Sequence, residues 1–154
     1  ASSYIKKISK FIALKGRGKI LNVQYNKKKI TLIDDSYNSS PESLKASIIF
    51  LNRLGNKRRK ICVLGDMYEL GSFSKQFHLN VKKILKDNKI SNVYIIGEKM
   101  RILFNTLPTS LECKHFENLE ELYMELKKDI KNDDIILFKA SRAIQLDKII
   151  KKFC

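Results

Sequence analysis

The chain has 154 residues, 44% of them hydrophobic, and carries 31 Lys and Arg against 16 Asp and Glu, a formal net charge of +15 at pH 7. This length supports one well-formed hydrophobic core and is too short for two ordinary domains. No apolar run approaches the roughly 18 residues that a membrane-spanning helix requires. The N-terminal segment 1–7 lacks an apolar centre and an initial methionine, so we expect a piece of a longer protein without a secretory signal.

The positive charge is the strongest bulk signal, and nucleic-acid-binding proteins show such an excess, usually gathered on one face. Here the lysines are spread over the whole length, and the two short clusters at 27–29 and 57–60 have no interleaved aromatic residues. This pattern favours a solvated, lysine-rich surface. A basic nucleic-acid-binding α/β module stays open as an alternative.

The three cysteines, Cys62, Cys113 and Cys154, are far apart and odd in number. No C-x-x-C spacing is present to hold a metal, and any disulfide scheme leaves one cysteine over. Cys62 lies in an apolar run, where it is expected to be a small buried hydrophobic residue. We therefore expect a reducing, cytoplasmic setting and no metal site in this chain.

The first part of the chain predicts a boundary and then a hairpin. An amphipathic piece over 4–14 is followed by Gly16-Arg17-Gly18, which has the composition of a hinge. We therefore divide the chain into a linker or tail of a preceding domain at 1–15 and a compact domain at 16–154. Two β-rich runs, at 19–25 and 29–33, are joined by turn residues and predict a hairpin.

Helices and strands then alternate to the C-terminus. Ser39-x-x-Glu42 predicts a capping box, Pro41 suits a first helical turn, and Gly55 closes the helix. Apolar spacing predicts further helices over 73–87, 99–107, 119–130 and 146–153, and strands over 60–64, 93–96, 113–116 and 135–138.

Strands that alternate with helices, each strand a continuous apolar run, indicate a mostly parallel sheet covered on both faces. The predicted fold class is therefore α/β, a three-layer Rossmann-like domain with an antiparallel hairpin at the N-terminal edge of its sheet.

Unusual polar residues follow the strands of this predicted sheet. Ligands of open parallel sheets bind outside the carboxyl ends of the strands. Carboxylates accept hydrogen bonds from ribose hydroxyls, while Lys and Arg bind phosphate or carboxylate groups. The six glycines form neither a phosphate-binding loop nor a dinucleotide fingerprint, so the pattern predicts half of a nucleotide site. The residues at the strand ends are Asp34, Asp35, Asp66, Lys139, Ser141 and Arg142.

Several motifs in order resemble the C-terminal domain of the Mur ligase family, from Arg17 nearly to the end of the chain. They are Arg17 between two glycines, Asp34-Asp35-Ser36-Tyr37-Asn38-Ser39-Ser40-Pro41, Gly65-Asp66-Met67-Tyr68-Glu69-Leu70-Gly71, His78 and Lys139-Ala140-Ser141-Arg142. The aspartate-pair motif resembles the branch that adds D-alanyl-D-alanine to UDP-N-acetylmuramoyl-tripeptide for peptidoglycan. The chain departs from the family at Ser39, commonly Ala, and at Ala140, commonly Gly.

The resemblance implies a three-domain, ATP-dependent amide-bond ligase. Its first domain would bind the UDP-sugar, and its central domain would carry the phosphate loop, the magnesium ligands and the catalytic machinery. This chain would then be inactive alone. Its partners would be those two domains, ATP, the UDP-sugar tripeptide and the dipeptide, over which it closes.

The resemblance also assigns roles to individual residues. Arg17 would be a hinge arginine that reaches the nucleotide phosphates, and Asp35 a partner of the ribose or of an arginine. Substrate contacts are expected from Tyr37, Asn38, Lys139, Ser141 and Arg142. Further candidates, each of which can instead stabilise a turn, are Asp34, Asp66 and Glu69. His78 is expected to be structural, since no nucleophile or metal partner lies nearby in sequence, and no catalytic residue is expected.

A receiver-like phosphoacceptor domain is the second alternative. It also has a carboxylate pair after an early strand, an aspartate after a middle strand and a lysine after the last strand. The order here differs, because Asp66 ends the strand that directly follows the aspartate pair. The initial hairpin is also foreign to that design.

Overall fold

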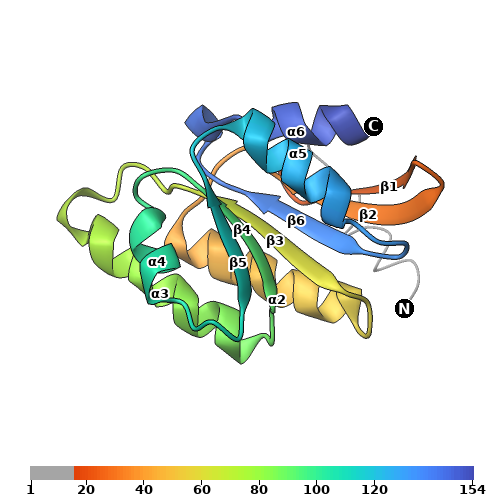
Figure 1. Cartoon of the computed structure of the whole chain (residues 1–154). Helices are drawn as coiled ribbons and strands as arrows, with labels where there is room; N and C mark the ends of the chain where they lie inside the picture. Colours follow the sequence, from red (N-terminus) through yellow and green to blue (C-terminus); the bar gives the residue numbers. More distant parts are fainter. Residues whose placement is uncertain (1–15) are drawn as a thin grey trace, which may run out of the picture.

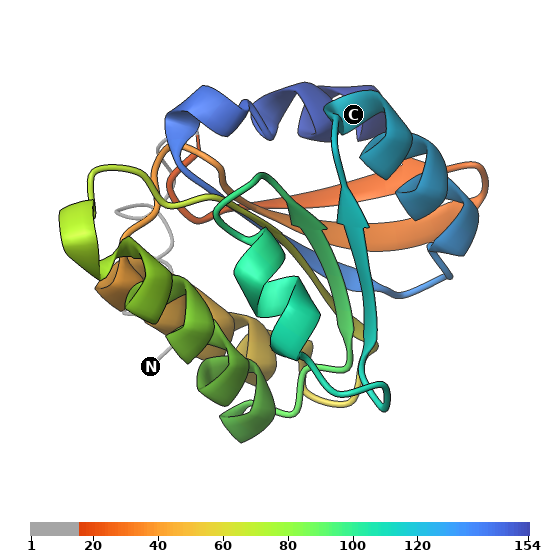
Figure 2. The ribbon, with the colours of Figure 1, turned by 60° about the vertical axis from the view of Figure 1, so that its left-hand side comes forward.

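The computed structural model describes residues 16–154, which form a mixed sheet between two layers of helices (Figures 1 and 2). The amphipathic piece expected over 4–14 and the tail assigned to 1–15 lie outside the described residues. The strands are β1 (Lys19–Tyr25), β2 (Lys28–Asp35), β3 (Lys60–Gly65), β4 (Asn92–Ile96), β5 (Glu112–Phe116) and β6 (Ile135–Lys139). The helices are α2 (Pro41–Gly55), η1 (Gly71–Phe73), α3 (Ser74–Asp87), α4 (Arg101–Thr106), α5 (Leu119–Asp129), η2 (Arg142–Ile144) and α6 (Asp147–Phe153).

The strand order is β1-β2-β6-β3-β4-β5, with β1 antiparallel to β2 and every other pair parallel. This confirms the predicted α/β class and the antiparallel hairpin at the N-terminal edge. The last strand, β6, lies between β2 and β3, and its five residues are all buried. Consequently the end of β6 is in register with the end of β2, with Lys139 opposite Asp35.

Two apolar cores lie on the two faces of the sheet, each beneath one of the two layers of helices that Figure 2 shows. Helices α2, α3 and α4 cover one face through Leu44, Ile48, Leu51, Val81, Leu85 and Leu103, together with Met100, which directly precedes α4. Helices α5 and α6 cover the other through Leu122, Leu126, Ile149, Ile150 and Phe153. Because side chains alternate along a strand, β2, β3, β4, β5 and β6 supply apolar groups to both cores, whereas β1 packs only against the core under α5 and α6. Among the described helices, none is long and apolar enough to cross a membrane.

The hairpin turn is shorter than the sequence predicted. Asn26 and Lys27 both have positive φ angles, 47° and 65°, as a two-residue turn with the twist of its strands requires. Strand β2 also runs through Asp34 and Asp35, because its pairing with β6 continues to Lys139. Both aspartates are therefore held in the strand end and not in the loop that follows.

The start of α2 differs from the predicted capping box by one residue. The Ser40 hydroxyl accepts a hydrogen bond from the Ser43 N–H at 3.2 Å, and the Ser43 hydroxyl accepts one from the Ser40 N–H at 2.9 Å. Pro41 occupies the first helical residue, as expected. The predicted cap, Ser39, is buried, and its hydroxyl has no partner among the described residues. The Ser39-x-x-Glu42 prediction was wrong because a small hydroxyl residue at the third helical position completes the box equally well.

Ser40→Ala is expected to lower the free energy of unfolding by about 1 kcal/mol, because the first turn loses its side-chain acceptor. Ser39→Ala is the matched control at the adjacent position. It should be neutral or stabilising, since it removes a buried hydroxyl that gains no hydrogen bond. Urea unfolding of both variants measures the difference, and a larger loss for Ser39→Ala would contradict this assignment of the cap.

Candidate functional site

The carboxyl ends of β2, β3 and β6 lie at one edge of the sheet, and the loops that follow them carry most of the residues singled out from the sequence. The tips that carry Asp35 and Lys139 emerge on the same side, since these residues face each other in register. The expected convergence of polar groups at this edge is therefore present in the fold.

Asp35 and Lys139 are paired with each other. The Lys139 ammonium lies 3.0 Å from Asp35 Oδ2 and donates a hydrogen bond to the Asn38 carbonyl at 2.7 Å. The Ser47 hydroxyl of α2 donates to the same carboxylate oxygen. The Lys139 side chain is only 2% exposed, and burial holds its pKa below the usual value while Asp35 opposes that shift. This pair fastens the end of β6 to the β2–α2 loop.

The neighbouring aspartates point to opposite faces of the sheet, as alternation along a strand requires. Asp35 contacts α2 through Ser47, whereas Asp34 lines a hollow on the side of α6. Asp34 Oδ1 accepts hydrogen bonds from the Ser36 hydroxyl at 2.5 Å and the Ser36 N–H at 3.2 Å. Its contacts are thus those of a turn-stabilising residue.

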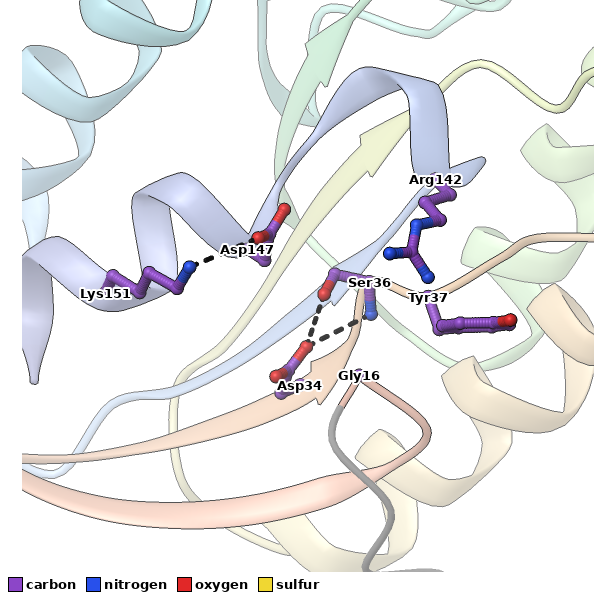
Figure 3. A pocket seen from close by; sticks show the side chains of 7 residues that line it. All are labelled: Gly16, Asp34, Ser36, Tyr37, Arg142, Asp147 and Lys151. Carbon is purple, nitrogen blue, oxygen red and sulfur yellow. Dashed lines mark hydrogen bonds and ion pairs between the residues drawn. The ribbon is translucent and has the colours of Figure 1, made fainter.

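The hollow has a volume of about 280 Å³ and lies between the β2–α2 loop and the last helices (Figure 3). The Lys151 ammonium, at its α6 side, lies 3.7 Å from Asp147 Oδ2. The lining residues are Gly16, Asp34, Ser36, Tyr37, Arg142, Asp147 and Lys151. Asp147 and Lys151 could not be selected from the sequence, because an acid–base pair four residues apart on a helix is a common surface pattern.

The Tyr37 ring, at the opening of this hollow, contacts the side chains of two arginines. The Arg17 guanidinium carbon lies 4.1 Å from the centre of the Tyr37 ring, and that of Arg142 lies 5.0 Å from it. The pKa of the Tyr37 phenol is lowered, first by hydrogen bonding to Arg17 and then by the positive charges of Arg17 and Arg142. Three residues that the sequence selected separately therefore form one group.

Ser141 and Asp66 connect the loops of this edge. The Ser141 hydroxyl accepts a hydrogen bond from the Tyr68 N–H at 2.8 Å, and the Ser141 N–H donates to the Asp66 carbonyl at 2.9 Å. Asp66 is only 3% exposed, and its carboxylate accepts a hydrogen bond of 2.8 Å from the N–H of Met100, at the start of α4. Glu69 is exposed, with a φ of 64°. A buried, hydrogen-bonded Asp66 is poorly placed to accept a phosphoryl group, which speaks against the receiver alternative.

His78 is fully buried in α3 and bonds on both ring nitrogens. Nε2 accepts from the Met67 N–H at 3.1 Å, and Nδ1 lies 2.6 Å from the Ser74 carbonyl oxygen. A carbonyl oxygen only accepts, so the proton is assigned to Nδ1. The ring thereby ties the loop after β3 to α3, which is the kind of role expected for it.

The basic clusters are largely engaged at the opposite edge of the sheet. Arg59 forms an ion pair with the buried Asp134 at 2.8 Å, and Arg58 donates to the Asp133 carbonyl at 2.8 Å. The Lys28 ammonium donates to the Ile130 carbonyl at 2.9 Å. These three cations therefore hold the chain together, while Lys27, Lys29 and Lys57 of the same clusters are exposed.

Comparisons with known proteins agree with this description. The family model described as Mur ligase, glutamate ligase domain matches residues 16–142. The chain is 35% identical over 136 residues, 88% of its length, to the UDP-N-acetylmuramoyl-tripeptide–D-alanyl-D-alanine ligase of Rickettsia prowazekii. It is 33% identical over 125 residues, 79% of its length, to the ligase of the same name from Bacillus subtilis.

The fold is similar to that of a solved structure, the MurF ligase from Thermotoga maritima in complex with ADP. The TM-score is 0.76 at 28% sequence identity, over 91% of this chain. The chain spans about 29% of the Rickettsia protein, 27% of the Bacillus protein and 30% of the Thermotoga chain. Since the family model covers most of the sequence and the fold agrees, the chain belongs to the Mur ligase family, as a domain of the C-terminal type.

Proposed function

We propose that the chain is the C-terminal, nucleotide-closing domain of an ATP-dependent ligase that adds D-alanyl-D-alanine to UDP-N-acetylmuramoyl-tripeptide in peptidoglycan precursor synthesis. The observation that carries the proposal is the convergence of Arg17, Tyr37 and Arg142 at the carboxyl edge of a Mur ligase domain. Relatives that match most of the chain are ligases named for this reaction. The reaction uses cytoplasmic precursors, so the proposed location is the cytoplasm.

The site has the character of one half of a nucleotide pocket. Two guanidinium groups match the oxygens of a phosphate or carboxylate in charge and geometry. The chain has no glycine-rich loop to cradle a phosphate chain. ATP and magnesium are therefore held mainly by a central domain outside this sequence, and this domain adds cations when it closes.

The proposed residue roles follow exposure and contacts. Arg17, Tyr37, Asn38 and Arg142 are exposed at the edge and are placed to contact ligand. Arg17 and Asp35 serve the nucleotide, and the partly exposed carboxylate of Asp35 is steadied by its lysine partner. The other substrate candidates, Lys139 and Ser141, are buried and act by fixing the loops around the ligand. Residues 1–15 belong to the tail of the preceding domain in this proposal.

A complementation experiment tests the function. The isolated chain should show no ATPase activity, and joined to the first two domains of a matching ligase it should restore dipeptide addition. Arg17→Ala should lower that activity by about 100-fold or more, the loss expected for a group that binds developing negative charge. The measurement is the rate of UDP-N-acetylmuramoyl-pentapeptide formation.

Arg101→Ala serves as the control in the same hybrid enzyme. Arg101 is also a partly exposed arginine, but it is paired with Glu98 and Glu117 away from the hollow. This variant should keep the unsubstituted rate within about threefold, as expected for a surface ion pair. ATP hydrolysis by the isolated chain, or full activity of the Arg17→Ala hybrid, would overturn the proposed function.

A further inference from the structure

The Tyr37 ring brings together two cations from distant parts of the chain. Arg17 precedes β1, Arg142 begins η2 after the last strand, and both guanidinium carbons lie within 5.0 Å of the ring centre. The two guanidiniums carry like charges, so they do not attract each other. The negative face of an aromatic ring attracts each of them. The Tyr37 ring is therefore a contact that both arginines share.

The backbone holds this ring in position. The Tyr37 N–H donates a hydrogen bond to the Gly16 carbonyl at 2.7 Å, and the Gly18 N–H donates to the Asp34 carbonyl at 2.8 Å. Gly16 has a φ of 78°, and a Cβ at that position would lie 3.1 Å from Tyr37 Cβ, so glycine permits the close approach. Arg17, between the two anchored glycines, thus starts from a backbone fixed to the end of β2.

The charges around the hollow leave the two arginines without an acidic partner. Asp34 is turned to Ser36, and Lys151 faces Asp147 (Figure 3). Within residues 16–154, neither Arg17 nor Arg142 forms an ion pair with a carboxylate. The pKa of the Tyr37 phenol is lowered first by a hydrogen bond from Arg17 and then by the positive charges of Arg17 and Arg142, which agrees with two cations beside the ring. Both guanidiniums are exposed and therefore accessible to an anion.

We propose that Tyr37 is a positioning residue, a shared aromatic platform that holds Arg17 and Arg142 together as a clamp for an oxyanion of the phosphate class. Two forked guanidiniums fixed in advance bind a tetrahedral oxyanion with less loss of side-chain freedom than two mobile ones. That this oxyanion belongs to the nucleotide rests on the proposed function, and it extends the nucleotide role from Arg17 to Arg142, for which a substrate contact was expected. The clamp itself rests on the geometry of the three side chains.

Titration of the 154-residue chain with inorganic pyrophosphate tests the clamp. The ring signals of Tyr37, followed by NMR, should shift on binding. Tyr37→Leu should weaken binding by about tenfold, because both cation–π contacts are lost. Tyr37→Phe keeps the ring and should bind within about threefold of the unsubstituted chain. Equal affinity of the Leu variant and the unsubstituted chain, or no Tyr37 shift at all, would overturn the proposal.

Tyr68→Leu is the matched control. Tyr68 lies at the same edge of the sheet, is 36% exposed against 37% for Tyr37, and carries a single cation, Lys99, 6.0 Å from its ring centre. This variant should bind pyrophosphate as the unsubstituted chain does. If Tyr68→Leu loses as much pyrophosphate affinity as Tyr37→Leu, the effect is a general one of surface aromatic residues, and the clamp is overturned. Thermal unfolding of each variant confirms that a weakened one is folded.

The Tyr37 phenol gives a readout that a merely structural residue would not. Pyrophosphate in the clamp offsets the positive field, so the pKa of Tyr37 should rise on binding. Tyr68 provides the contrast, since its pKa is raised by burial and by Asp66, and pyrophosphate should leave it unchanged. Ultraviolet titration of the single variants Tyr37→Phe and Tyr68→Phe separates the two phenols. A Tyr37 pKa that is unaffected by pyrophosphate would count against the clamp.

A carboxylate probe and the hybrid enzyme separate the remaining outcomes. If D-alanyl-D-alanine, and not pyrophosphate, binds in a Tyr37-dependent manner, the phosphate class is wrong. A hybrid enzyme that fails to add the dipeptide while pyrophosphate binding still depends on Tyr37 overturns the proposed function and leaves the clamp in place. An active hybrid in which Tyr37→Leu binds pyrophosphate normally overturns the clamp alone.

Discussion

Asp35→Ala is expected to lower the free energy of unfolding by about 3–5 kcal/mol, because it leaves a buried ammonium without its counter-ion. Lys139 is 2% exposed, and Asp35 Oδ2 is 3.0 Å from its nitrogen. The Ser47 hydroxyl loses its carboxylate acceptor in the same step. Urea unfolding at neutral pH measures the loss.

The pH dependence of this variant gives a second test. Burial already lowers the pKa of Lys139 from 10.5, and removal of Asp35 takes away the charge that opposes this shift. The unfolded chain then binds more protons than the folded one between the lowered pKa and 10.5, so stability rises with pH across that interval. The difference in free energy of unfolding between Asp35→Ala and the unsubstituted chain should therefore become smaller as the pH approaches 10.5.

Asp87→Ala is the control for this prediction. Asp87 pairs with Lys83 at 3.5 Å on the surface of α3, with side chains 57% and 83% exposed, and its removal should cost less than about 0.5 kcal/mol. Equal losses for Asp35→Ala and Asp87→Ala would contradict the buried pair. Replacement of both partners, Asp35→Leu with Lys139→Met, should recover most of the stability, because no unpaired charge remains.

Gly97→Ala is expected to destabilise the domain by about 3 kcal/mol or more, through backbone strain and a steric clash. Gly97 has a φ of 112°, and a Cβ there would lie 2.4 Å from the Asp66 carboxylate. That carboxylate cannot move away freely, since it accepts the Met100 N–H hydrogen bond at the start of α4. Urea unfolding of the substituted chain measures the effect.

Gly71→Ala separates strain from clash. Gly71 also has a positive φ, 59°, but a Cβ at this position meets no atom within 4 Å. Only the cost of a left-handed alanine, about 1 kcal/mol, should remain. If the two alanine variants lose the same stability, the contact between Gly97 and Asp66 does not constrain this edge of the sheet.

The sequence was sufficient wherever structure depends on neighbours along the chain. Apolar runs and helical periodicity predicted the strands and helices within a few residues, because each element repeats its contacts at a fixed spacing. Alternation of strands and helices gave the mostly parallel sheet, with its hairpin edge, and the strand-end rule brought the polar loops to one side. The cap of α2 was missed by one residue, since Ser39 and Ser40 are chemically equivalent in sequence and only the buried position of Ser39 distinguishes them.

Only the tertiary structure decided which of these residues touch. Insertion of β6 between β2 and β3 pairs Lys139 with Asp35, and it brings Arg142 to the ring that also carries Arg17. The pairing of β6 with β2 also keeps Asp34 and Asp35 within the strand, where alternation places them on opposite faces. Such contacts depend on strand order, and strand order is set by the packing of the whole core. The polar residues of this edge can therefore be identified from the sequence, whereas the contacts between them are determined by the fold.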